Sequence, residues 1–169
     1  EPDARICIFS QRNLRREFHR CANYEQEDVI SDVDDVELIA PQPVDGGELA
    51  RRWRNRLAYR IPRTRFDPGI KPVHINRRHE LFMSYCEFVH DLRTLDAVSG
   101  FGKYCRISAC YLTEFWARAI PQSRDLIRRL APFDVIFTNC AATVKPLQKA
   151  IDRPCHYVLP GVDALGFTP

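Results

Sequence analysis

The sequence is poor in the glycine-rich signatures that many nucleotide-binding and hydrolytic enzymes carry. Only 7 of its 169 residues are glycine. The turn after the first apolar run reads Ser10-Gln11-Arg12-Asn13 and contains none, whereas a dinucleotide pyrophosphate needs the close backbone approach that glycine permits. Neither a G-x-x-x-x-G-K-[ST] phosphate loop nor a G-x-S-x-G nucleophile elbow occurs. These absences argue against NAD or FAD binding and against P-loop chemistry.

Long apolar runs and closely spaced cysteines are also missing. No apolar stretch reaches the roughly 18 residues that span a bilayer, and the first residues contain no signal-peptide core. The seven cysteines include no C-x-x-C pair, and Cys7 and Cys110 lie inside apolar runs. We therefore expect buried thiols, no metal site and a cytoplasmic location. A net charge of +3 is too small to indicate nucleic-acid binding.

Charge is concentrated in two blocks of opposite sign. Seven acids lie between positions 25 and 37, and seven arginines lie between positions 51 and 65. We expect these blocks to face solvent or each other. The arginines belong to a predicted helix over 48–60 whose other side is apolar and includes Trp53. Such a helix either packs its apolar side on the core or lies on an anionic membrane surface, which would make the protein peripheral to a membrane.

Apolar runs of strand length alternate with segments of helical spacing. The predicted strands cover 5–9, 36–40, 80–85, 104–112, 134–138 and 156–159. The predicted helices cover 13–31, with Asn13 as N-cap, 48–60, 89–98, 123–130 and 142–151, and an irregular loop covers 60–78. This alternation is typical of a parallel sheet with helices on both faces. The sequence therefore predicts one three-layer α/β/α, Rossmann-like domain over 1–169 with a mainly parallel sheet of about six strands.

Ligands of such sheets bind outside the carboxyl ends of the strands, so the polar residues that follow each strand are the candidates. We expect the following residues to bind a ligand at this edge: Ser10, Gln11, Arg12, Asn13, Glu87, Trp116 and Asn139. Among them Arg12 either holds a phosphate near the first helix or belongs to a solvated basic face.

Two residues at this edge are candidates for proton transfer. Glu114 follows an apolar strand beside Phe115 and Trp116, and a carboxylate that is desolvated against aromatic rings has a raised pKa that suits acid–base chemistry. Alternatively, Glu114 caps the helix that follows it. His90 suits a general base, because the unperturbed pKa of histidine lies near the working pH range. Alternatively, it belongs to the first turn of its helix, beside the first-turn acid Asp91.

Three phrases in the second half of the chain carry a family resemblance: YLTEFW at 111–116, LAPFDVIFTN at 130–139, and YVLPGVD at 157–163 followed by FTP at 167–169. Together they resemble the amino-terminal domain of GT-B glycosyltransferases of the retaining, family-4-like kind, including the CgeB-like branch. In that family a Phe-Asp pair opens a late strand, and a P-G-V-D…F-x-P phrase leads into a second domain. The likeness covers residues 80–169 well and residues 5–40 by pattern only.

The resemblance implies the acceptor-binding half of a nucleotide-sugar-dependent glycosyltransferase. Glu114 and His90 would be catalytic, and the ligand-binding residues named above would hold a sugar acceptor. Residues 155–169 would form the last strand and a hinge, at Gly161 and Asp163, toward a C-terminal domain that binds a UDP- or GDP-sugar. This chain would then bind no cofactor and would be inactive alone. The family's glycine-rich turn after the first strand is replaced here by residues 10–13.

A second hypothesis comes from a different functional class. The chain would be a stand-alone Rossmann-like module that binds a ligand or a partner and catalyses nothing. The two hypotheses differ in the expected length of the protein. The sequence has no initiating Met, so we expect the chain to begin at a cut or a trimmed tail.

Overall fold

The computed structural model describes residues 4–12, 21–44 and 69–159. Several predictions concern residues outside these ranges. They are the N-cap and ligand-binding role of Asn13, the helix at 48–60 with its membrane contact, and the hinge at Gly161 and Asp163.

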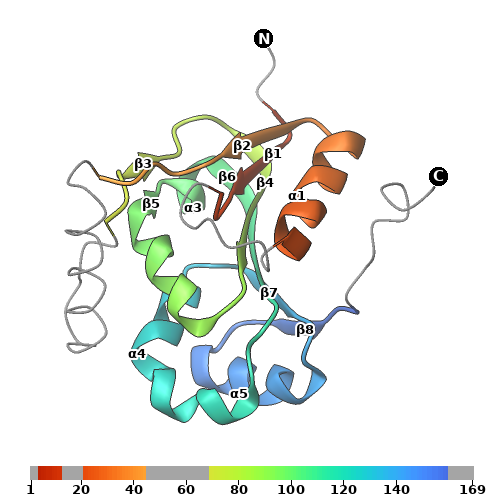
Figure 1. Ribbon diagram of the computed structural model, residues 1–169, viewed down its shortest axis with the longest axis vertical. Helices are drawn as coiled ribbons and strands as arrows, with labels where there is room; N and C mark the ends of the chain where they lie inside the picture. The colour runs from red at the N-terminus through yellow and green to blue at the C-terminus, as the bar shows by residue number, and fades with distance from the viewer. Residues whose placement is uncertain (1–3, 13–20, 45–68, 160–169) are drawn as a thin grey trace.

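Six strands form one sheet in the order β2-β1-β4-β6-β7-β8. They are β1 (Ile6–Phe9), β2 (Val36–Ile39), β4 (His79–Cys86), β6 (Cys105–Leu112), β7 (Val135–Thr138) and β8 (Cys155–Tyr157). Every neighbouring pair runs parallel. The predicted fold class is confirmed, because helices lie on both faces of this sheet, which makes a three-layer α/β, Rossmann-like fold (Figure 1).

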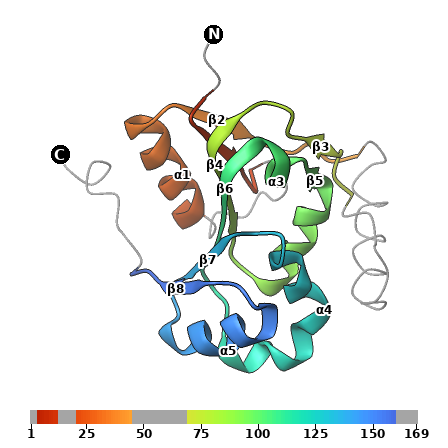
Figure 2. The same ribbon diagram turned by 180° about the vertical axis from the view of Figure 1, so that it is seen from behind.

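The helices divide unequally between the two faces of the sheet. Helix α1 (Cys21–Val33) packs on one face, while the opposite face carries the 3-10 helix η2 (Val89–Ala97) and three α-helices (Figures 1 and 2). These three are α3 (Phe101–Tyr104), α4 (Arg124–Ile127) and α5 (Ala141–Ile151). Because both faces are covered, the strands are apolar at successive positions, and all four residues of β1 are buried.

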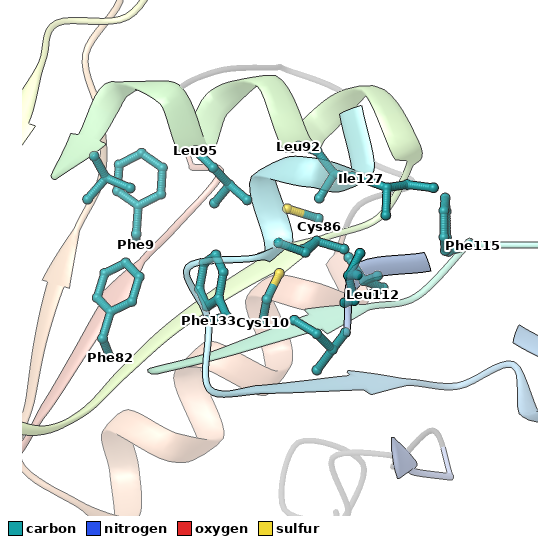
Figure 3. Packing of buried hydrophobic residues seen from close by; sticks show 14 of the residues in the cluster. Phe9, Phe82, Cys86, Leu92, Leu95, Cys110, Leu112, Phe115, Ile127 and Phe133 are labelled. Carbon is teal, nitrogen blue, oxygen red and sulfur yellow. The ribbon is translucent and has the colours of Figure 1, made fainter. Parts of the chain in front are cut away.

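The larger core lies between the sheet and the helices η2, α3, α4 and α5. Phe9 and Phe82 project into it from neighbouring strands, and Leu92 and Leu95 project from η2 (Figure 3). The thiols of Cys86 and Cys110 point into the same layer, and both are free and buried (Figure 3). Each large side chain that is fully buried stabilises the fold by about 1.5–3 kcal/mol.

The smaller core lies between the sheet and α1. It contains the buried residues Ile6 and Ile8 of β1, Tyr85 of β4 and Tyr111 of β6. Ile30 of α1 packs against them. Strand residues therefore alternate strictly between the two cores, with odd-numbered β1 residues in one and even-numbered residues in the other.

Two predicted helices differ in type from what their spacing indicated. Residues 89–97 form a 3-10 helix, with Leu92 and Leu95 buried as predicted. The Thr94 hydroxyl donates to the backbone carbonyl of Asp91, three residues earlier, and this competes with regular α-helical bonding. The predicted helix at 123–130 is the single-turn α4, followed by the 3-10 turn Arg128–Leu130.

The predicted loop at 60–78 is partly regular where the structure describes it. Strand β3 (Val73–His74) pairs with β5 (Val98–Ser99) in a small second sheet. Gly100 follows this pair with φ of 87°, and a Cβ there would lie 2.2 Å from the carbonyl oxygen of Ile75. Glycine is required at this position because no other residue fits both the backbone angle and the close approach.

Candidate functional site

The topology singles out one place along the carboxyl edge of the sheet. Counted over this sheet alone, the strand order is 2-1-3-4-5-6. The chain leaves β1 for α1 on one face and leaves β4 for η2 on the other. In doubly wound sheets such a switch point, here between β1 and β4, is where ligands bind. Ser10, Gln11 and Arg12 follow β1, and Glu87 follows β4, so the predicted residues do flank it.

The turn after β1 is held by side-chain hydrogen bonds on both sides of the sheet. The Ser10 hydroxyl donates to Glu27 Oε2 of α1 at 2.7 Å. The Gln11 amide donates to Thr94 Oγ1 of η2 at 2.7 Å. The Arg12 backbone N–H donates to Ser10 Oγ at 3.0 Å. These bonds join the helices of opposite faces across the switch point and fix the turn without glycine.

Arg12 is engaged by carboxylates of α1. Its Nε donates to Glu27 Oε2 at 2.9 Å, and its terminal nitrogen donates to Asp28 Oδ1 at 2.6 Å and to the Tyr24 carbonyl at 2.8 Å. The guanidinium also lies over the Tyr24 ring, 5.2 Å from its centroid. Its side chain is only 30% exposed. Arg12 therefore forms ion pairs with the buried Glu27 and the exposed Asp28. The alternative prediction, that Arg12 belongs to a solvated basic face, is wrong.

Glu27 is the functional candidate that the sequence analysis missed. The acidic block was predicted to face solvent or the arginine block, and for Glu27 this is wrong, because its side chain is fully buried. Burial raises the pKa of the carboxyl group, and the hydrogen bonds from Ser10 and Arg12 oppose the shift. Asn23, Glu27 and Ile30 lie at i, i+4 and i+7, which is the one available signal that Glu27 shares the buried face of α1.

The residues after β4 have structural partners. The buried Asp91 carboxylate accepts hydrogen bonds from the backbone N–H groups of Phe88 at 2.9 Å and Glu87 at 3.2 Å. Asp91 is thus the first-turn acid of η2, as predicted. The His90 ring stacks on Phe88 with their centroids 5.6 Å apart, in the first turn of the same helix. Both His90 and Glu87 are half-buried.

Glu114 is exposed to solvent, so the predicted desolvation against aromatic rings is wrong. The reason is that the chain turns sharply after β6. Phe115 enters the core with 2% exposure, while Glu114 and Trp116 point outward, and Trp116 is 54% exposed. Glu114 does not cap a helix either: the next element, the 3-10 turn Ala117–Ala119, begins after Trp116 and has no side-chain cap.

Backbone hydrogen bonds bring the loops after β4, β6 and β7 together. The N–H of Glu114 donates to the carbonyl of Glu87 at 2.8 Å, and that of Thr113 donates to Cys86 at 3.1 Å. The N–H of Asn139 donates to Leu112 at 3.4 Å. We call Glu87, Glu114, Trp116 and Asn139 the rim group. The rim group follows β4, β6 and β7, whereas the residues after β1 bond to α1 and η2.

Two further observations on the described residues concern metal ions and membrane spans. No group of three or more His, Cys, Asp or Glu side chains there is arranged to hold a metal ion. None of the helices described is long and apolar enough to cross a bilayer.

Comparison with known proteins adds no family to this description. No protein-family model matches the chain, and neither a curated protein nor a solved structure is significantly similar to it.

Proposed function

We propose that this chain is the acceptor-binding half of a nucleotide-sugar-dependent glycosyltransferase, with the acceptor bound at the rim group. The observation that supports this is the arrangement of the loops after β4, β6 and β7. They place two carboxylates, an amide and a half-exposed indole at the carboxyl edge of a parallel sheet. Carboxylates and amides hydrogen-bond hydroxyl groups, and an aromatic face covers the apolar side of a ring.

The exposed carboxylate of Glu114 is suited to accept a proton from the attacking hydroxyl of the acceptor. The backbone N–H of Glu114 donates to the carbonyl of Glu87, which ties the loop after β6 to the loop after β4. His90, held flat against Phe88, is the second candidate base. The donor UDP- or GDP-sugar would bind a C-terminal domain, and catalysis would come mainly from positioning the hydroxyl against the sugar and stabilising the departing phosphate.

A module that binds a ligand without catalysis is the second candidate function. The observation that favours it is the engagement of the turn after β1. The side chains of this turn hydrogen-bond to α1 and η2 instead of facing a phosphate, as the contacts of Ser10, Gln11 and Arg12 show. The phosphate of a sugar-nucleotide donor would therefore have to bind residues other than these three.

The test uses the complete gene product and a panel of UDP- and GDP-sugars. Thermal shift and donor hydrolysis report donor binding, and the variant Glu114→Gln reports the role of the rim carboxylate. We expect this variant to lose about 100-fold or more in turnover, a typical contribution of a general base, with its melting temperature unchanged.

Glu80→Gln is the matched control. Glu80 is an exposed glutamate like Glu114, but it lies near the amino end of β4, away from the carboxyl edge of the sheet. It pairs with Arg106. This variant should keep the wild-type rate. A complete protein that responds to none of the sugar nucleotides would overturn the glycosyltransferase proposal and leave the binding module. Wild-type turnover in Glu114→Gln would remove Glu114 from the mechanism.

A further inference from the structure

Two acceptor atoms on the inner side of α1 have no hydrogen-bond partner among the described residues. They are Glu27 Oε1 and Asn23 Oδ1, and both atoms are buried. The residues themselves are 0% and 4% exposed. Buried polar atoms are nearly always paired, and two unpaired acceptors one helical turn apart call for donors that the described part of the chain does not supply.

These atoms lie at the switch point. Ser10, the first residue after β1, donates to Glu27, so Glu27 marks the carboxyl edge of the sheet. Helix α1 connects two parallel strands and therefore runs antiparallel to them. Asn23, four residues before Glu27, lies about 6 Å farther past the edge, at 1.5 Å of rise per residue. The pair thus extends from the sheet edge outward, in the direction from which a ligand of this fold arrives.

The chemistry of the pair selects the ligand. Glu27 Oε2 is already taken by Ser10 and Arg12, and Oε1 is left to accept. An anionic ligand would be repelled by Glu27 and Asp28, and a cationic one would compete with the guanidinium of Arg12, which both carboxylates already bind. A neutral ligand with two hydroxyl groups meets neither obstacle, and each hydroxyl supplies the donor that one acceptor lacks.

We propose that Asn23 and Glu27 bind a pair of hydroxyl groups on a sugar or ribose ring. Tyr85 of β4 is buried in the core on the same side of the sheet as α1. This diol site is separate from the rim group and stands whether or not the chain is part of a glycosyltransferase. The diol could belong to the ribose of a nucleotide or to a carbohydrate ring. Both offer two neighbouring hydroxyl groups, and the experiment below distinguishes them.

The test is a titration of the whole chain followed by ¹⁵N–¹H correlation spectra. One arm uses uridine against 2′,3′-dideoxyuridine, and the other uses methyl glucoside against its 2,3-dideoxy analogue. We expect amide shifts around residues 23–27 with the diol-bearing member of one arm and none with its deoxy control. The arm that responds identifies the source of the diol.

Two variants assign the contacts. Glu27→Gln places a donor where the ligand must donate, and Asn23→Ala removes the second acceptor without touching the Arg12 pair. Each should weaken the affinity for the diol about tenfold or more. Asn23→Ala keeps the test valid if Glu27→Gln does not fold. Glu80→Gln, an exposed residue near the start of β4 that pairs with Arg106, should bind the diol as the wild type does.

The outcomes separate this site from the proposed function. If neither diol shifts the amides more than its deoxy control does, the two acceptors hold an internal water only, and the proposal is overturned even when sugar nucleotides are hydrolysed. Equal affinity in Asn23→Ala and the wild type would also overturn it. Loss of donor hydrolysis in Glu114→Gln with intact diol binding would concern the rim alone.

Discussion

Removing Arg12 should destabilise the protein in a way that depends on pH. The substitution Arg12→Met keeps an unbranched side chain of similar length over Tyr24 and deletes the charge. It leaves the buried Glu27 carboxylate with the Ser10 hydroxyl as its one remaining hydrogen-bond donor among the described residues. The unpaired charge, rather than lost packing, then dominates the effect.

The expected size follows from the burial of the pair. Removing one partner of a fully buried pair costs about 3–5 kcal/mol. Because Arg12 is 30% exposed and Glu27 is fully buried, we expect about 3 kcal/mol at pH 7.5, the lower end of that range. In a protein of this size each kcal/mol moves the melting temperature by about 2–4 °C, so the expected drop is about 6–12 °C.

The sign of the pH dependence follows from the pKa of Glu27. Burial already raises that pKa in the native protein, and loss of Arg12 removes a group that lowers it. The native state then takes up a proton at a pH where the unfolded chain, with a glutamate pKa of about 4.3, does not. Stability of the variant therefore increases as pH falls toward that value and decreases as pH rises.

The assay is urea unfolding of wild type and variant at pH 7.5 and pH 5, with Arg106→Met as control. Arg106 pairs with Glu80, and both side chains are more than half exposed, so its loss should cost about 0–1 kcal/mol at either pH. A deficit for Arg12→Met that is equal at the two pH values would refute the reasoning. So would a deficit no larger than that of the control.

Two further predictions concern the backbone and the thiols. Gly69→Ala should cost about 1–2 kcal/mol from its positive φ alone, because no described residue lies within 4 Å of the added Cβ. Gly100→Ala should cost more, because its Cβ meets the Ile75 carbonyl. Equal unfolding free energies for the two variants would contradict this. Burial raises the pKa of Cys7 to about 12, so iodoacetamide at pH 8 should leave it unmodified in the folded protein while the half-buried Cys140 reacts. Peptide mass spectrometry checks this, and early labelling of Cys7 would count against it.

The layered fold was predictable because both of its signals are local. Strands buried on both faces, such as β1 and β7, read as short apolar runs, and the helix after β7 shows its spacing clearly. The type of the helix at 89–97 was not predictable from spacing, because Leu92 and Leu95 are buried in a 3-10 helix as they would be in an α-helix.

The candidate site was only half predictable. Ser10 and Arg12 were predicted because ligands bind at the carboxyl ends of parallel strands. Their partner Glu27 was missed because it lies in a block of seven acids, which predicted exposure to solvent. Arg12, with which Glu27 pairs, lies 15 residues away in the sequence. The prediction that Glu114 is desolvated was wrong because sequence neighbours need not be neighbours in space. Phe115 points into the core and does not shield the Glu114 carboxylate from solvent.

The place of β1 in the sheet has a consequence for how the protein is made. Strand β1 is second in the order, between β2 and β4, and its contact with β4 joins Phe9 to Ser84 across 75 residues of sequence. During synthesis the β1–α1–β2 unit therefore emerges well before the strand that completes it. Closing so long a loop is entropically slow, and until it closes one edge of β1 offers unpaired backbone groups to other chains. We expect the nascent chain to depend on chaperones most during this interval.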